Sequence, residues 1–226
     1  MLNNLLNPDK IVLFLTQAVM TIIPALICIT FHELAHGYAA YCLGDRTAKD
    51  MGRLTFNPIK HIDIIGLLMM VIFRFGWAKP VPVNMNNFRK PRSFMAITAI
   101  AGPLSNIILA VVVMFIYGLL YEAIGGMNAL LSGSGLHMIF QNTVFLSIAL
   151  AVFNLVPIPP LDGSKVLFSF LSEEVYYKLM RYERYGIIVL ILVLNTPVFR
   201  STIGKLTETI FYSCLTILDA GFRLVN

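Results

Sequence analysis

The sequence predicts an all-α, multi-pass membrane protein: a helical transmembrane bundle with a short re-entrant, β-edge segment near the cytoplasmic face. Of the 226 residues, 58% are hydrophobic and only 13% are charged, and the mean hydropathy is +0.78. A soluble domain carries about 25% charged residues. The net charge of +5 is too small and too scattered for a nucleic-acid-binding surface. We therefore expect a lipid bilayer, and no nucleic acid, as the chain's surroundings.

The first predicted span is one long helix from Pro8 to Leu43. Its start is typical, because Asn7 can cap it, Pro8 suits the first helical position and Asp9 places an acid in the first turn. Such a helix would be about 54 Å long, against a hydrocarbon core of about 30 Å. It must tilt, kink or protrude, and Pro24 is the natural kink site.

The next apolar segment, residues 62–73, is predicted to dip into the membrane and return. It is too short to span, and both flanks, 44–61 and 75–92, are basic. Within the second flank, Val81 and Val83 of segment 76–87 alternate with prolines, and a proline-bearing strand is confined to sheet edges. We expect a β-edge there that pairs with an extended polypeptide by strand addition; a plain membrane-surface loop is the alternative.

Two further spans are predicted at 93–121 and 136–157. The first lacks any charged side chain, and the second returns across the bilayer after a turn rich in glycine and serine. Residues 172–184 mix charged and apolar side chains, as in an interfacial helix. Residues 185–218 contain either a last span or a shallow hairpin, and the pattern leaves this open.

The distribution of basic residues predicts the orientation. Regions 44–92 and 164–184 hold 13 of the 17 Lys and Arg residues, whereas 122–160 holds none. Because cytoplasmic loops carry the excess of Lys and Arg, we place the first two regions inside, with the N-terminus and the 122–135 turn outside. We expect a single integral-membrane domain over residues 1–226 of a multi-pass cell-membrane protein.

One polar cluster interrupts the first span, and it has the pattern HExxH. His32 and His36 stand one turn apart on one helical face, which suits capture of a Zn²⁺ ion, and Glu33 is in reach of a metal-bound water. Ionisable groups within a span cost roughly 2.5–3.5 kcal/mol each. Something must compensate for this cost, and a metal ion does so directly.

A catalytic zinc needs a third protein ligand and an open position for water. The acids expected at membrane depth on the cytoplasmic side are Asp63 and Asp162. Asp162 is the better candidate, because it follows a rigid proline run at the end of a span and precedes Gly163, which allows close approach.

Three blocks of the sequence resemble the site-2 protease family of intramembrane zinc metalloproteases. They occur in the family's order: HELAHGYAAYCLGD (32–45), AGPLSN (101–106) and NLVPIPPLDG (154–163). The resemblance implies an active site that cleaves peptide bonds in or beside transmembrane segments of membrane-protein substrates, and the distribution of basic residues places that site toward the cytoplasmic side. The predicted β-edge at 76–87 would then bind the substrate.

The resemblance also implies roles for individual residues. His32, His36 and Asp162 would bind one zinc ion per chain, and Glu33 would be the general base. Asn154 would position the substrate or stabilise the tetrahedral oxyanion, as a side-chain amide can do by donating a hydrogen bond.

Some functional questions stay open in the sequence. Asn106 either acts at the reaction centre or forms an interhelical hydrogen bond beside the small residues Gly102 and Ser105. The family often carries PDZ or CBS domains, for which this chain has no room, so their contribution to substrate choice or regulation is either absent or supplied by a regulatory membrane partner. The alternative function is a zinc-binding membrane transporter or sensor. It is disfavoured because a transporter would spread its ionisable groups along several helices.

Overall fold

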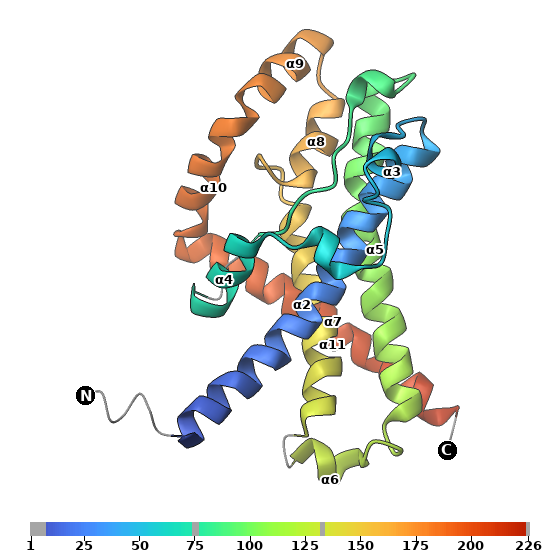
Figure 1. The fold of residues 1–226 in the computed structure, drawn as a ribbon, viewed down its shortest axis with the longest axis vertical. Helices are drawn as coiled ribbons and strands as arrows, with labels where there is room; N and C mark the ends of the chain where they lie inside the picture. The colour runs from blue at the N-terminus through green and yellow to red at the C-terminus, as the bar shows by residue number, and fades with distance from the viewer. Residues whose placement is uncertain (1–7, 74–76, 132–133, 225–226) are drawn as a thin grey trace, which may run out of the picture.

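A computed structural model describes residues 8–73, 77–131 and 134–224 of the chain (Figure 1). Nearly all regular structure in these residues is helical. In chain order the helices are α2 (Pro8–Cys42), α3 (Thr47–Asp50), η1 (Pro58–His61), α4 (Ile64–Phe73), η2 (Met85–Asn87), α5 (Pro91–Leu120), α6 (Gly126–Leu131), α7 (Gly135–Asn154), α8 (Asp162–Ser169), α9 (Glu173–Tyr182), η3 (Glu183–Tyr185), α10 (Gly186–Leu194) and α11 (Pro197–Arg223).

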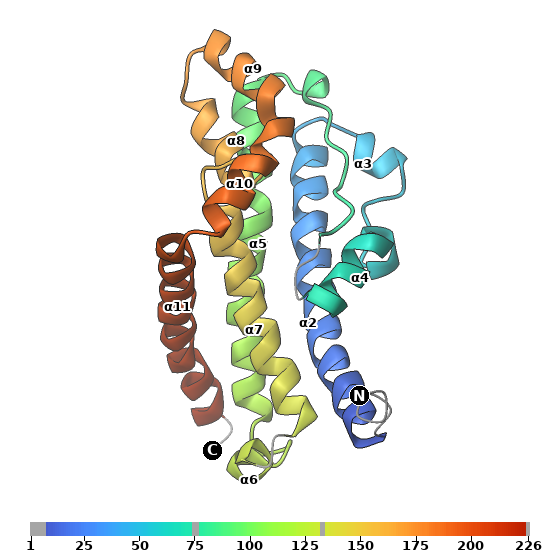
Figure 2. The same ribbon diagram turned by 90° about the vertical axis from the view of Figure 1, so that its left-hand side faces the viewer.

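Among the described residues, three helices are long and apolar enough to cross a membrane, which confirms the predicted multi-pass helical bundle. They are Phe14–Cys42 within α2, Pro91–Leu120 (α5) and Gly135–Asn154 (α7). Helix α5 lies at the centre, because it packs against α2, α7, α8 and α11 (Figures 1 and 2). The middle of the bundle is therefore built around the helix that carries AGPLSN.

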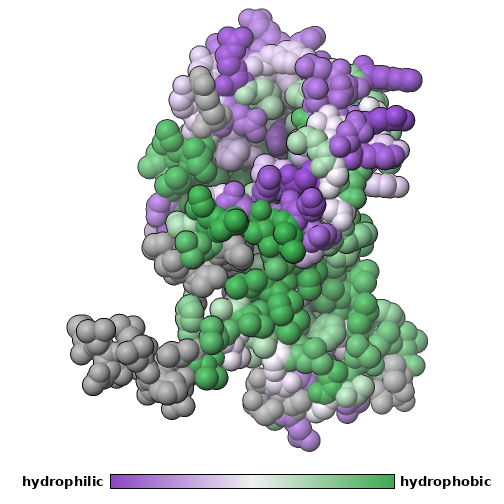
Figure 3. Space-filling model, viewed as in Figure 1, coloured by the Kyte–Doolittle hydropathy of each residue, from purple (hydrophilic) through white to green (hydrophobic). Residues whose placement is uncertain are grey.

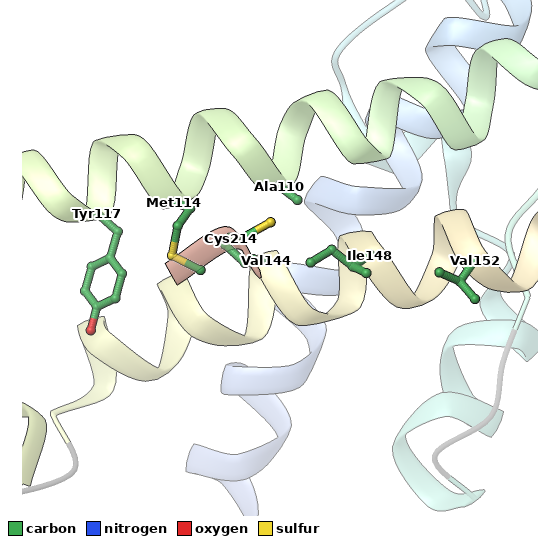
Figure 4. Packing of buried hydrophobic residues seen from close by; sticks show 7 residues of the cluster. All are labelled: Ala110, Met114, Tyr117, Val144, Ile148, Val152 and Cys214. Atoms are coloured by element: carbon green, nitrogen blue, oxygen red, sulfur yellow. The ribbon is translucent and has the colours of Figure 1, made fainter. Parts of the chain in front are cut away.

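The apolar core lies between α5, α7 and α11 (Figure 4). Its side chains interleave along the length of α5 and α7, and α11 adds one of them. The members are Ala110, Met114, Tyr117, Val144, Ile148, Val152 and Cys214. Because this core lies along the membrane-spanning part of the bundle, it stabilises the helices on which the polar site is placed.

The C-terminal region forms two helices instead of one straight span. Helices α10 and α11 meet at an 82° bend, so the pair is either a broken span or a re-entrant loop. Helix α11 packs along α5 and α7 (Figure 2), whereas α10 continues from α9 on the side of the molecule away from α5 (Figure 1). The described chain therefore has three candidate spans, or four when the bent pair counts as one.

The β-edge prediction is not supported by the structure. Among the described residues there is no strand, and Ile62 and Ala78 form one isolated antiparallel bridge. The physical reason is in the prediction itself: Pro80 and Pro82 have no N–H, so the segment runs extended without forming a ladder. Gly76 lies outside the described residues. The bridge brings the two ends of the α4 segment together. The predicted dip of residues 62–73 into the membrane is likewise not supported by the structure and stays a prediction.

Hydrophilic residues gather at one end of the molecule. Figure 3 shows them over α3, α8 and α9, above an apolar surface that covers the lower part of the bundle. This division is what a membrane protein requires, with apolar side chains facing the lipid and polar ones facing water.

Candidate metal centre

Two helices bring three candidate ligands together. His32 and His36 project from one face of α2, and Asp162 is the first residue of α8. The turn before α8 is tight: a Cβ on Gly163 would lie 2.2 Å from the carbonyl oxygen of Leu155. Glycine therefore lets the LDG turn fold back against the end of α7, which aims Asp162 at α2.

The three side chains meet within hydrogen-bonding distance. Nε2 of His32 lies 3.1 Å from Oδ2 of Asp162, Nε2 of His36 lies 3.2 Å from the same oxygen, and the two nitrogens are 3.0 Å apart. Among the described residues, His32, His36 and Asp162 form the group of potential ligands that lie close enough together to hold a metal ion. All three side chains are largely buried.

These separations fit zinc. Tetrahedral Zn²⁺ with bonds of about 2.0–2.1 Å separates neighbouring ligand atoms by about 3.3–3.4 Å. The three atoms stand only slightly closer than that. Two imidazoles and one carboxylate are also the donor types of catalytic zinc sites, which leave a fourth position for water.

Helix α5 supports the two histidines from behind. Nδ1 of His36 donates a hydrogen bond to the backbone carbonyl of Thr98 at 2.7 Å, which leaves Nε2 free to bind a metal. One turn further, a Cβ on Gly102 would lie 2.4 Å from Nε2 of His36 and 2.7 Å from Nε2 of His32. Glycine at this position therefore makes the room that the two rings occupy.

Glu33 and Asn154 face the same cavity, which has a volume of about 330 Å³ and is also lined by His32, His36 and Asp162. The Glu33 carboxylate accepts a hydrogen bond from the backbone N–H of Val81 at 2.7 Å. The Asn154 amide donates to the Leu150 carbonyl of its own helix at 2.9 Å, which uses one of its two N–H groups.

Lys165 is a charged residue of this cavity that the sequence did not single out. Its Nζ lies 3.9 Å from Oδ1 of Asp162 and 3.9 Å from Glu183. The two oxygens of Asp162 thus have different partners, Lys165 on one side and the histidines on the other. Without a metal, burial raises the pKa of the Asp162 carboxyl, but the hydrogen bonds that it accepts from His32 and His36 outweigh burial and hold that pKa below its usual range.

Asp63 lies elsewhere in the fold, and so do three buried His and Cys residues. Asp63 accepts a hydrogen bond from the backbone N–H of Gly66 at 2.9 Å, so it caps the start of α4. His61, His137 and Cys28 are buried in separate contacts: Nε2 of His61 donates to the Thr55 carbonyl, Nδ1 of His137 is hydrogen-bonded to the Tyr117 hydroxyl, and Sγ of Cys28 donates to the Thr143 carbonyl. Of the two acids considered from the sequence, the structure brings only Asp162 to the histidines.

Fold and site together describe a multi-pass membrane protein with a buried His-His-Asp group and a neighbouring carboxylate. Residues 20–196 match the model of Peptidase family M50. The "Putative zinc metalloprotease YwhC" of Bacillus subtilis is 43% identical over 203 residues, which are 89% of this chain and 92% of that protein. No solved structure matches the chain.

Two more distant relatives carry similar names. The "Putative zinc metalloprotease Rip2" of Mycolicibacterium smegmatis is 27% identical over 76% of this chain and 65% of its own length. The "Putative zinc metalloprotease MJ0611" of Methanocaldococcus jannaschii is 33% identical over 61% of this chain and 63% of its own length.

The chain belongs to Peptidase family M50, the site-2 protease family. This confirms the predicted family, a membrane metalloprotease with zinc as its metal. The transporter or sensor alternative is not favoured.

Proposed function

We propose that this chain is an intramembrane zinc endopeptidase that hydrolyses peptide bonds within or next to transmembrane segments of membrane proteins. One observation carries the proposal: the HExxH histidines of α2 meet Asp162 of α8, with Glu33 in the same cavity. Three buried ligand atoms of the right type and separation would hold one zinc ion per chain.

Each residue of the cavity has a proposed chemical role. His32, His36 and Asp162 would hold the zinc ion, which supplies Lewis acidity to water and to the scissile carbonyl. Glu33 accepts the proton of the attacking water and passes it to the leaving amine. Asn154 has a second N–H free of its Leu150 contact, and it donates this to the oxygen on which negative charge develops.

The extended segment 77–83 is the proposed place where substrate binds. Pro80, Val81 and Val83 line the cavity beside Glu33. A peptide bond inside a helix is shielded by its own hydrogen bonds, so a substrate must be unwound before water can attack. An extended substrate laid against this segment would be held by main-chain hydrogen bonds, as in strand addition.

The proposed orientation places the active site toward the cytoplasm. The cavity lies at the end of α2 that leads into the basic segment before α4. Lys165 lines the cavity, and helix α9 lies at the same end of the molecule (Figure 1). The positive-inside rule assigns such an end to the cytoplasmic side. A regulatory membrane partner is part of the same proposal and would act at this end.

The test combines metal analysis with cleavage of a panel of single-span membrane proteins by the purified chain. Glu33→Gln should keep zinc and lose cleavage, because Glu33 is a base and not a ligand. Asp162→Asn should lose both, whereas Asp63→Asn, the matched acid outside the site, should keep both. If Glu33→Gln loses zinc as readily as His32→Ala, the role of Glu33 is wrong; if the zinc-loaded chain cleaves nothing, the proposed activity is wrong.

A further inference from the structure

A buried amide on α5 contacts the metal site from outside the ligand group. Asn106 has no exposed surface, and its Nδ2 lies 3.4 Å from Nδ1 of His32. Its backbone carbonyl accepts a hydrogen bond from Oγ of Ser147 at 2.8 Å, which ties α5 to α7 at this level. Its side-chain Oδ1 is buried and has no hydrogen-bond partner among the described residues.

Zinc binding would change the kind of hydrogen-bond partner that Nδ1 of His32 needs from Asn106. A neutral imidazole that binds a metal through Nε2 carries its proton on Nδ1, so Nδ1–H becomes a donor in need of an acceptor. Turning the amide of Asn106 over exchanges the places of Nδ2 and Oδ1. The buried oxygen then gains the partner that it lacks, and His32 gains its acceptor.

We infer that Asn106 is a positioning residue that holds His32 for the metal by accepting a hydrogen bond from its Nδ1–H. The inference rests on the proposed zinc site. It gives both histidines the same kind of support, because Nδ1 of His36 already donates to the carbonyl of Thr98. An acceptor at Nδ1 fixes the tautomer and the ring orientation and makes the imidazole a stronger ligand.

The spacing along α5 agrees with this role. Thr98, Gly102 and Asn106 follow one another at intervals of four residues, so they lie on one face of the helix. Thr98 accepts a hydrogen bond from His36, Gly102 makes room for both rings, and Asn106 contacts His32. One face of one helix thus supports the whole histidine pair.

A purely structural interhelical bond is the competing role, and the chain offers a matched example of it. Nδ2 of Asn142 on α7 donates to the backbone carbonyl of Met20 on α2 at 2.9 Å, and Asn142 is not among the residues that line the metal cavity. Replacing Asn142 removes an interhelical amide bond without touching a zinc ligand.

The experiment measures zinc affinity of the purified full chain in detergent by competition with a chromophoric chelator, and thermal unfolding of the metal-free protein. Asn106→Leu, which keeps the size but has no acceptor, should bind zinc 10- to 100-fold more weakly. Asn106→Asp keeps an acceptor and should bind zinc at least as tightly as the wild type. Asn142→Leu should stay within about twofold of the wild type in zinc affinity, whatever it does to thermal stability.

The outcomes separate the inference from the proposed function. If the wild type binds no zinc, or His32→Ala binds it as the wild type does, the proposed site fails. If those two behave as expected but Asn106→Leu keeps wild-type zinc affinity, the inference alone is overturned. If Asn106→Leu does not fold, Asn106→Asp decides: wild-type affinity or better supports the inference, and a loss of tenfold or more overturns it.

Discussion

Substituting Gly102 by alanine should weaken zinc binding severely, because the added Cβ would displace the two histidine rings. The added Cβ would lie 2.4 Å from Nε2 of His36 and 2.7 Å from Nε2 of His32, where ordinary van der Waals contact begins at 3.4 Å. The two nitrogens must therefore retreat by about 1.0 Å and 0.7 Å, or α5 must move by a similar amount. Zinc–ligand distances tolerate only about 0.2 Å. We expect at least a hundredfold loss of zinc affinity.

The assay needs two controls, because any overpacked site costs about 1–3 kcal/mol of stability. Gly118→Ala is the matched clash, since its Cβ would lie 2.2 Å from the carbonyl oxygen of Leu218, at the contact of α5 with α11. Gly204→Ala is the matched open position, with nothing within 4 Å of its Cβ. Zinc affinity is measured by chelator competition, and the thermal unfolding midpoint is measured without metal.

The prediction is specific to the zinc measurement. Gly102→Ala should lose zinc affinity, Gly118→Ala should lose thermal stability while keeping zinc affinity, and Gly204→Ala should keep zinc affinity without losing thermal stability, because alanine is the better helix former. Wild-type zinc affinity in Gly102→Ala would refute the placement of the two histidine rings against α5. An equal zinc loss in Gly118→Ala would show that general destabilisation, and not ligand geometry, removes the metal.

Three further predictions concern the segment that leads to the cavity. Asp45→Ala should destabilise the fold by about 1–3 kcal/mol in thermal unfolding, because the buried carboxylate accepts the backbone N–H of Asn84 in the extended segment. Burial raises the pKa of Asp45, but its hydrogen bonds outweigh burial and lower that pKa below its usual value. This stabilisation should therefore be present at neutral pH and disappear as pH falls through the lowered pKa. The Asp45→Ala variant should lack this part of the acid-dependent loss of stability. Cysteines placed at Thr47 and Asn86 should be labelled from the same side of the membrane, and labelling from opposite sides would contradict a returning segment. Val81→Pro removes the N–H that Glu33 accepts, so cleavage should fall about tenfold or more at unchanged zinc content; equal cleavage would mean that this hydrogen bond has no part in catalysis.

The parts of the fold and site that depend on side-chain pattern could be predicted from the sequence. Charge-free runs located the spans now seen as α5 and α7, and the i, i+4 spacing placed His32 and His36 on one face of α2. Asp162 could be singled out because few acids follow an apolar span so closely. Such features survive folding because burial of apolar surface and the helical repeat are local properties of the chain.

The parts that depend on backbone atoms could not be predicted. Thr98 contributes its carbonyl oxygen and Val81 its N–H, and every residue type has a carbonyl while all but proline have an N–H. The β-edge prediction failed for the related reason that valine and proline alternation describes an extended backbone but does not supply a partner strand. Lys165 was missed because a single basic residue after Asp162 is indistinguishable from a solvated loop residue.

The position of α5 explains why the AGPLSN block accompanies the two ligand blocks. Helices α2 and α8 bring ligands from residues 130 positions apart, and α5 packs against both. Two histidines on one helix have a fixed spacing, but their imidazole rings can still rotate. Contact with a neighbouring helix restricts that rotation. The face of α5 toward α2 therefore governs metal geometry, whereas the contact at Gly118 toward α11 governs stability alone. Substitutions on the two sides of this one helix should separate into zinc-affinity defects and thermal-stability defects.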